Sequence, residues 1–146
     1  MMSQHTSIES HRAAEPVGPY PHARRVGGLV FLSGIGPRTR GSGDIPGAVV
    51  DANSTLIDYS IEAEMRSCFE NIRAVLADAG LAWDNIVDVT VFLTNMKRDW
   101  PTYNRVYAEF FPADRPRPTR TTIEVSALPT GGKTPIHVEM KVIAAA

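Results

Sequence analysis

The amino-acid sequence predicts an α+β fold in which two helices pack on one face of a mixed β-sheet. Residues 59–79 repeat apolar side chains every three or four positions, which is the pattern of an amphipathic helix. Residues 86–94 and 136–144 alternate apolar and polar side chains, as strands with one buried face do. The predicted segments follow the order strand, strand, helix, strand, helix, strand, strand. We therefore expect a two-layer ββαβαββ sandwich.

The bulk composition fits a single globular domain. The chain of 146 residues is long enough for one core, and we expect a flexible tail over residues 1–15 and one domain over residues 16–146. A net charge of −1 gives no broad attraction to nucleic acid or to an anionic membrane. No apolar run approaches the ~20 residues of a membrane span, and the polar start lacks the apolar core of a signal peptide. A single cysteine excludes an intrachain disulfide framework, so we expect a cytoplasmic protein.

A β-hairpin is predicted after a stiff, proline-rich segment at residues 16–21. Residues 23–26 and 29–33 are its strands, and the Gly-Gly pair between them supplies the positive φ that tight hairpin turns need. The second strand runs into Gly34, where the missing side chain permits close approach of a ligand or another chain. The glycine-rich residues 38–53 form a long loop, and such loops are usually either functional or disordered.

The helix over residues 59–79 is followed by Gly80, a natural C-terminal cap. Cys68 lies on its apolar stripe, so we interpret this residue as a small core side chain and not as a nucleophile. In the strand over residues 86–94, the alternate residues that begin at Val87 are all apolar. This face is expected to meet the helices, and the mixed opposite face suggests a wetter surface or a subunit contact.

A second helix is predicted over residues 100–111. Asp99 is expected to cap it, and Pro101 is tolerated in a first turn. Asn104 lies mid-helix, where a short amide is not favoured by propensity. This side chain either supports a neighbouring loop or is exposed.

The strand over residues 118–125 begins with a candidate carboxylate receptor. Arg120, Thr122 and Glu124 share one of its faces. The planar guanidinium of an arginine on a rigid strand matches the two oxygens of a carboxylate. From spacing alone, an ordinary surface arginine is an equally good interpretation.

The last strand, over residues 136–144, follows a turn at residues 128–135. His137, Glu139 and Lys141 share one face of this strand. From the residues alone, Glu139 is more readily a solvated carboxylate paired with a neighbour. Two possible ligands on one face are too few for a zinc site, so we expect no metal.

Seven short segments carry a pattern found in one known family. They are residues 18–20, 32–34, 71–80, 89–93, 104–107, 118–120 and 138–144. Together, and in this order, they resemble the Rid/YjgF family of reactive-intermediate imine deaminases, over nearly the whole chain outside the tail and the loop. The resemblance implies a chorismate-mutase-like fold, a homotrimer with active sites between subunits, and cofactor-free hydrolysis of imines.

The resemblance also implies roles for individual residues. By position, Arg120 matches the arginine that binds a substrate carboxylate, and Glu139 matches the glutamate that positions the attacking water. The residues that match positions lining or supporting the pocket are Tyr20, Ser33, Gly34 and Asn104.

The chain departs from the family in ways that concern the substrate. Thr122 stands where many members have cysteine, and Ile35 stands where many have glutamine. The loop after Gly34 and the turn before the last strand are longer than usual. The proposed carboxylate anchor and water site are not affected by these changes.

Residues 16–24 and 33–38 also resemble one subgroup, the 2-aminomuconate deaminases of bacterial aromatic degradation. This resemblance implies hydrolysis of 2-aminomuconate to 4-oxalocrotonate and ammonia. A muconate skeleton has a second carboxylate, which should meet a cation. The candidates lie near the hairpin and its loop: His22, Arg24, Arg38 and Arg40.

Other functions stay open at this point. A broad-range 2-imino acid deaminase would use the same residues on smaller substrates. A non-catalytic ligand-binding trimer, or an RNA-directed inhibitor, would not need Glu139 for chemistry. The near-neutral charge and the lack of interleaved basic and aromatic residues argue against nucleic acid. The residues do not distinguish a trimer from a hexamer, or show whether residues 38–53 form a lid.

Overall fold

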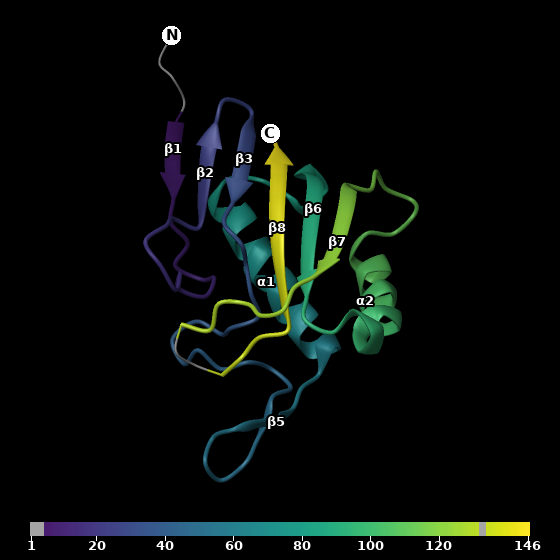
Figure 1. Cartoon of the computed structure of the whole chain (residues 1–146). Coiled ribbons are helices and arrows are strands. Elements are labelled where there is room, and N and C mark those ends of the chain that lie inside the picture. Colours follow the sequence, from purple (N-terminus) through teal and green to yellow (C-terminus); the bar gives the residue numbers. More distant parts are fainter. Residues whose placement is uncertain (1–4, 132–133) are drawn as a thin grey trace.

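A computed structural model of the chain describes residues 5–131 and 134–146. Six strands form one sheet in the order β1-β2-β3-β8-β6-β7, in which only β6 and β7 are parallel neighbours (Figure 1). The predicted mixed sheet is therefore confirmed. Its strands are β1 (His5–Ile8), β2 (Ala23–Val26), β3 (Leu29–Leu32), β8 (Val138–Ala145), β6 (Ile86–Leu93) and β7 (Thr119–Glu124).

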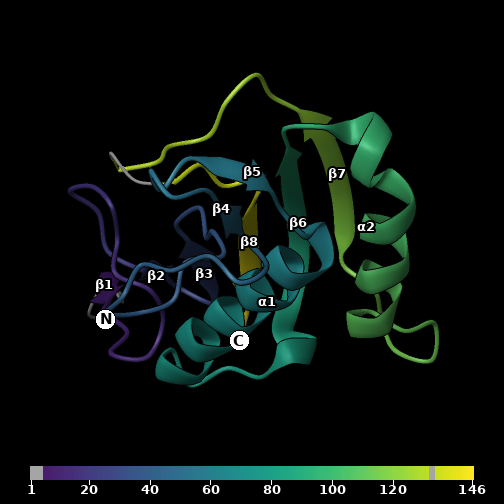
Figure 2. The same cartoon turned by 90° about the horizontal axis from the view of Figure 1, so that it is seen from below.

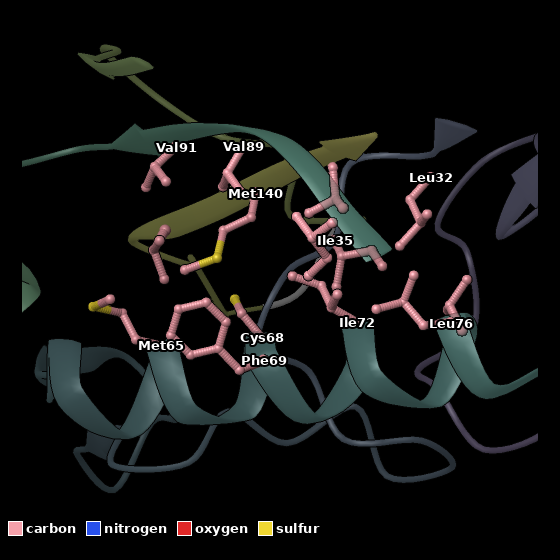
Figure 3. Packing of buried hydrophobic residues seen from close by; sticks show 14 of the residues in the cluster. Leu32, Ile35, Met65, Cys68, Phe69, Ile72, Leu76, Val89, Val91 and Met140 are labelled. Carbon is pink, nitrogen blue, oxygen red and sulfur yellow. The ribbon is translucent and has the colours of Figure 1, made fainter. Parts of the chain in front are cut away.

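Two helices, α1 (Ile61–Asp78) and α2 (Met96–Phe110), cover one face of this sheet (Figure 2). Helix α1 turns its apolar stripe toward β6 and β8, as the spacing predicted, and Figure 3 shows these side chains interdigitating. Cys68 is fully buried there, and burial raises the pKa of its thiol. A short 3₁₀-helix, η1 (Trp83–Asn85), leads into β6. Within the described residues, neither helix is long and apolar enough to cross a membrane.

The start of β6 differs from the predicted pattern. Val87 was expected to face the helices, but it is 42% exposed, whereas Ile86 is only 4% exposed. The cause is a register shift against β8 between Ile86 and Asp88, a bulge that turns Val87 outward. From Val89 onward the predicted alternation is confirmed, because every second residue to Leu93 is buried.

Helix α2 begins earlier than predicted. Its N-cap is Asn95, whose side chain accepts a hydrogen bond from the backbone N–H of Arg98. Asp99 is therefore not the cap but a buried residue of the first turn, and it accepts a hydrogen bond from the Tyr59 hydroxyl. Pro101 lies inside the helix and not in its first turn.

The expected tail is partly ordered. Residues 5–8 form β1 and pair with β2, and Ala13 is buried in the core. His22 connects this segment to the hairpin, because its Nδ1 accepts from Ser10 N–H and its Nε2 donates to Ala14 O. Residues 1–4 of the expected tail, and residues 132–133 of the predicted turn, lie outside the described residues.

The long loop also contains structure that its glycines did not suggest. A two-stranded hairpin, β4 (Val49–Val50) and β5 (Leu56–Asp58), extends away from the main sheet (Figure 1). It leads directly to Ser60, which caps α1 by accepting from Ala63 N–H.

Candidate functional site

A small cleft lies where the N-terminal segment meets the ends of β3 and β8. It is lined by six of the residues predicted for the site, and they come from segments far apart in the sequence. Those six are Tyr20, His22, Ser33, Gly34, Arg38 and Glu139. The predicted residues that do not line it are Arg24, Arg40, Asn104, Arg120 and Thr122.

Glu139 is the principal titratable side chain of the cleft. It lies on β8 between the buried Val138 and Met140, so its carboxylate points to the side of the sheet away from the helices. Burial raises the pKa of the Glu139 carboxyl. Among the residues that the structure describes, no group donates a hydrogen bond to this carboxylate. It is therefore available to bind a water or a ligand.

Gly34 lies directly against this carboxylate. A Cβ atom added at Gly34 would be 2.5 Å from Glu139 Oε2, which is closer than real Cβ contacts allow. The sequence prediction of close approach at this glycine is thus explained, and the group that approaches is a side chain of the chain itself. The absence of a side chain at this position lets the carboxylate lie along the cleft wall.

The cleft wall is held by backbone hydrogen bonds. Ile35 and Met140 exchange two of them, of 2.8 and 2.9 Å, which fix Gly34 beside β8. The Ser33 hydroxyl donates to Pro21 O at 2.7 Å. Tyr20 lines the cleft, and its hydroxyl accepts from Val17 N–H at 3.3 Å. These bonds set the wall before any ligand arrives.

Three of the cations considered for a second carboxylate are already engaged with backbone oxygens. Arg38 is buried and donates to Thr130 O and Thr134 O. Arg40 donates to Ser10 O and Ala13 O, and His22 bridges the N-terminal segment as described above. Arg24, the fourth candidate, is exposed on β2.

Arg120 lies in a separate cluster, formed by β7 and α2. Its guanidinium donates to Asn104 Oδ1 at 3.0 Å and lies 4.6 Å from the centre of the Tyr107 ring. Asn104 therefore supports Arg120, one of the two roles considered for it. The Thr122 hydroxyl is hydrogen-bonded to the Tyr103 hydroxyl at 2.5 Å. The residues predicted around Arg120 are thus brought together, but away from Glu139.

The sheet register explains this separation. Thr122 pairs with Val91, and Val91 pairs with Met140, so these three side chains share the helix-covered face, and Arg120 shares it with them. Glu139 pairs with Phe92 and lies on the opposite face, which we call the open face. Within one chain, therefore, the predicted carboxylate anchor and the predicted water site do not meet.

A second group of titratable side chains was not predicted. Glu64 on α1 is fully buried, and its two oxygens accept from His137 N–H at 2.8 Å and face His137 Nδ1 at 2.7 Å. The His137 ring stacks on Tyr59 at 3.5 Å, and Tyr59 donates to the buried Asp99. One signal was available in the sequence, because Glu64 interrupts the apolar stripe of α1 three residues after Ile61.

Metal binding is not indicated by the described residues. No three of their His, Cys, Asp or Glu side chains come together as a ligand set. The cleft instead offers a desolvated carboxylate beside an open space. A carboxylate in such a place can serve as an acceptor and donor of protons.

Comparison with known proteins places the chain in a family. The sequence profile described as endoribonuclease L-PSP matches residues 10–146. TdcF of Escherichia coli (strain K12) is 35% identical over 131 residues, which are 89% of this chain and 92% of TdcF. The reactive intermediate deaminase A of Arabidopsis thaliana is 31% identical over 130 residues, covering 89% of this chain and 62% of that protein.

Solved structures agree with the sequence comparison. A Rid family protein of unknown function from Yersinia pestis, YyfA, superposes with a TM-score of 0.80 and 34% identity over 97% of this chain and 99% of YyfA. E. coli TdcF with bound serine superposes with a TM-score of 0.79 and 31% identity over 97% and 98%. The predicted α+β fold is confirmed, and the chain belongs to the Rid/YjgF family, which the L-PSP profile describes.

Proposed function

We propose that the protein is a cofactor-independent hydrolytic deaminase of conjugated enamines and imines, with 2-aminomuconate as its substrate. The observation that carries this proposal is the carboxylate of Glu139, which lies partly buried and without a donor among the described residues in a preformed cleft. The names of related proteins, which include reactive intermediate deaminases, support the same reaction class.

The reaction needs few protein groups. A proton added to carbon converts the enamine to the iminium ion, and water then attacks the C=N carbon while Glu139 accepts a proton from the water. Glu139 returns this proton to the nitrogen of the carbinolamine. The C–N bond then breaks to release ammonia, and the hydroxyl group becomes the carbonyl by releasing its proton to solvent. The product is a 2-oxo acid, and no electrons are gained or lost. A carboxyl whose pKa is raised by burial is suited to both proton transfers.

We also propose that the site is completed by a neighbouring copy in a homotrimer. Arg120 is the anchor for the carboxylate beside the imine carbon, and it faces away from Glu139 of its own chain. In a trimer, Arg120 of one subunit could lie beside Glu139 of the next. The open face supports such an assembly because it exposes large apolar side chains that a neighbouring subunit could bury. Its apolar residues include Val26, Leu29, Phe31 and Ile123.

The test is ammonia release from 2-aminomuconate by the wild type, Glu139→Gln and Arg120→Ala. We expect Glu139→Gln to lower kcat by about 10²–10⁴-fold, the usual contribution of general acid–base catalysis. Arg120→Ala should mainly raise KM, because it removes a charge-assisted anchor. Sedimentation of all three proteins controls for assembly. A Glu139→Gln variant with unchanged kcat would move the proton transfers to another residue.

A broad-range 2-imino acid deaminase is the second candidate, and it fits the family membership equally well. Equal kcat/KM for 2-iminobutanoate and 2-aminomuconate would favour it. If neither compound is hydrolysed, the remaining function is ligand binding by the assembled trimer.

A further inference from the structure

We propose that Lys141 receives the second carboxylate of the substrate and so makes the site selective for dicarboxylates. This inference rests on the proposed deaminase function. It concerns a residue of β8 that lies two positions after Glu139 and shares its face of the sheet.

The position of Lys141 matches the length of a muconate. Residues along a strand rise by about 3.3 Å each, so the Cα atoms of Glu139 and Lys141 are about 6.6 Å apart. This spacing is close to the span of an extended six-carbon dicarboxylate. A water held by Glu139 at the imine carbon thus leaves the far end of the molecule near Lys141.

Lys141 does not itself line the cleft, but its ammonium binds the end of the strand that leads into the cleft wall. Its Nζ donates to Leu32 O, the carbonyl that directly precedes the wall residues Ser33 and Gly34. An ammonium has three N–H donors, and this contact uses one of them. The other two are available to a ligand carboxylate.

Lys141 has no acidic partner among the described residues, since none of the ion pairs there includes it. The side chain is only partly exposed, and burial lowers the pKa of its ammonium. A positive charge in such a place is stabilised when a carboxylate approaches it. A dicarboxylate substrate would supply that carboxylate.

The competing cations are less suitable. Arg38 donates to three backbone oxygens and Arg40 to two, and both ring nitrogens of His22 are engaged with the backbone. Lys141 makes one such bond. Arg24 pairs with Phe31, which pairs with Ile143, so it lies two strands and four residues from Glu139. With strands about 4.8 Å apart and a rise of about 3.3 Å per residue, their Cα atoms are about 16 Å apart.

The experiment compares two substrates in the full-length protein. Lys141→Met keeps the aliphatic stem and removes the charge, and it should lower kcat/KM for 2-aminomuconate by about 10- to 100-fold, the effect of one charge-assisted hydrogen bond. Hydrolysis of 2-iminobutanoate, which has one carboxylate, should stay within about twofold by the same reasoning. Lys141→Arg should restore part of the selectivity.

Matched variants keep the test decisive. Lys97→Met removes one lysine charge from the exposed surface of α2 and should leave both activities unchanged. An equal loss on both substrates in Lys141→Met, or no loss on either, would overturn the inference. A selective loss in Arg24→Met alone would assign the carboxylate to Arg24 instead.

The wild-type rates separate this inference from the function on which it rests. Hydrolysis of 2-iminobutanoate alone would leave the deaminase proposal standing and overturn the role of Lys141. Hydrolysis of neither compound would overturn both. Selective hydrolysis of 2-aminomuconate that depends on Lys141 would support both.

Discussion

Two glutamates that lie on packed elements of the same core, Glu64 on α1 and Glu139 on β8, have opposite environments. Glu64 is fully buried, and both of its oxygens are engaged by His137. Glu139 is partly buried at a cleft, and no described group donates to it. Glu64 and Glu139 both lie close enough to Cys68 to raise the pKa of its thiol.

These environments indicate different roles: the Glu64 carboxylate stabilises the fold, and the Glu139 carboxylate can take part in proton transfer. Burying a charge is costly unless partners compensate, and Glu64 has such partners. Glu139 is partly desolvated without compensation, which is the condition expected of a group that must exchange a proton. Variants of the two glutamates and of their surroundings test this contrast.

The largest effect should come from Glu64→Leu. This change leaves the backbone N–H and Nδ1 of His137 without their acceptor, and breaking a buried pair in this way costs about 3–5 kcal/mol. Urea unfolding measures the loss. Glu62→Gln is the matched control, because Glu62 pairs with Arg66 and Arg105 on the surface, and we expect it to cost less than about 1 kcal/mol. Equal effects in the two variants would remove the structural role of Glu64.

Gly34→Ala should have an intermediate effect, on catalysis and not on the fold. The added methyl group would lie 2.5 Å from Glu139 Oε2 and push the carboxylate out of place. Displacing a reacting group by about 1 Å can lower the rate by about 10²-fold, so we expect a 10- to 100-fold loss in kcat. Gly28→Ala, in the same hairpin with open space around it, is the control. Unchanged kcat in Gly34→Ala would show that the carboxylate tolerates displacement.

The smallest effect concerns pH and stability. The pKa of Glu139 is raised by burial, so its ionised form destabilises the folded state. The protonated carboxyl contributes its full stabilisation of the folded state below the unfolded-state pKa of about 4.3. This stabilisation is lost as pH rises through the folded-state pKa. Glu139→Gln should therefore gain stability relative to the wild type between pH 4 and pH 7.5. Urea midpoints at both pH values measure this, and a relative loss at pH 7.5 would contradict it.

The sequence predicted the elements whose local pattern agrees with their final packing. The apolar stripe of α1 and the alternation in β8 from Val138 onward needed only their own residues, and both are confirmed. The strand begins two residues later than predicted, and His137 contacts Glu64 of α1 instead of sharing a strand face with Glu139. The predicted start of α2 was wrong because Asn95 and Asp99 both have side chains that commonly cap helices. Only the contact between Asp99 and Tyr59 shows which of the two is not the cap. The bulge at Val87 was not predicted either, because it arises from the pairing of β6 with β8.

The arrangement of the candidate site was harder to predict for the same reason. The residues of the cleft come from segments far apart in the sequence, among them residues 13–22, 33–38 and 136–139. Their meeting is set by backbone bonds such as those between Ile35 and Met140. The partnership of Glu64 with His137 joins residues 73 positions apart. The opposite orientation of Arg120 and Glu139 follows from the parallel pairing of β6 with β7, which no local pattern encodes.

The placement of Arg120 and Glu139 on opposite faces has a genetic consequence. If each site takes its arginine from one subunit and its glutamate from the next, as proposed, a gene copy defective in Arg120 and another defective in Glu139 should complement each other. Mixed trimers would contain some contacts where both wild-type residues meet, about one quarter of them for random assembly of equal amounts. A cell that carries both defective alleles would then deaminate, although neither allele supports the activity by itself.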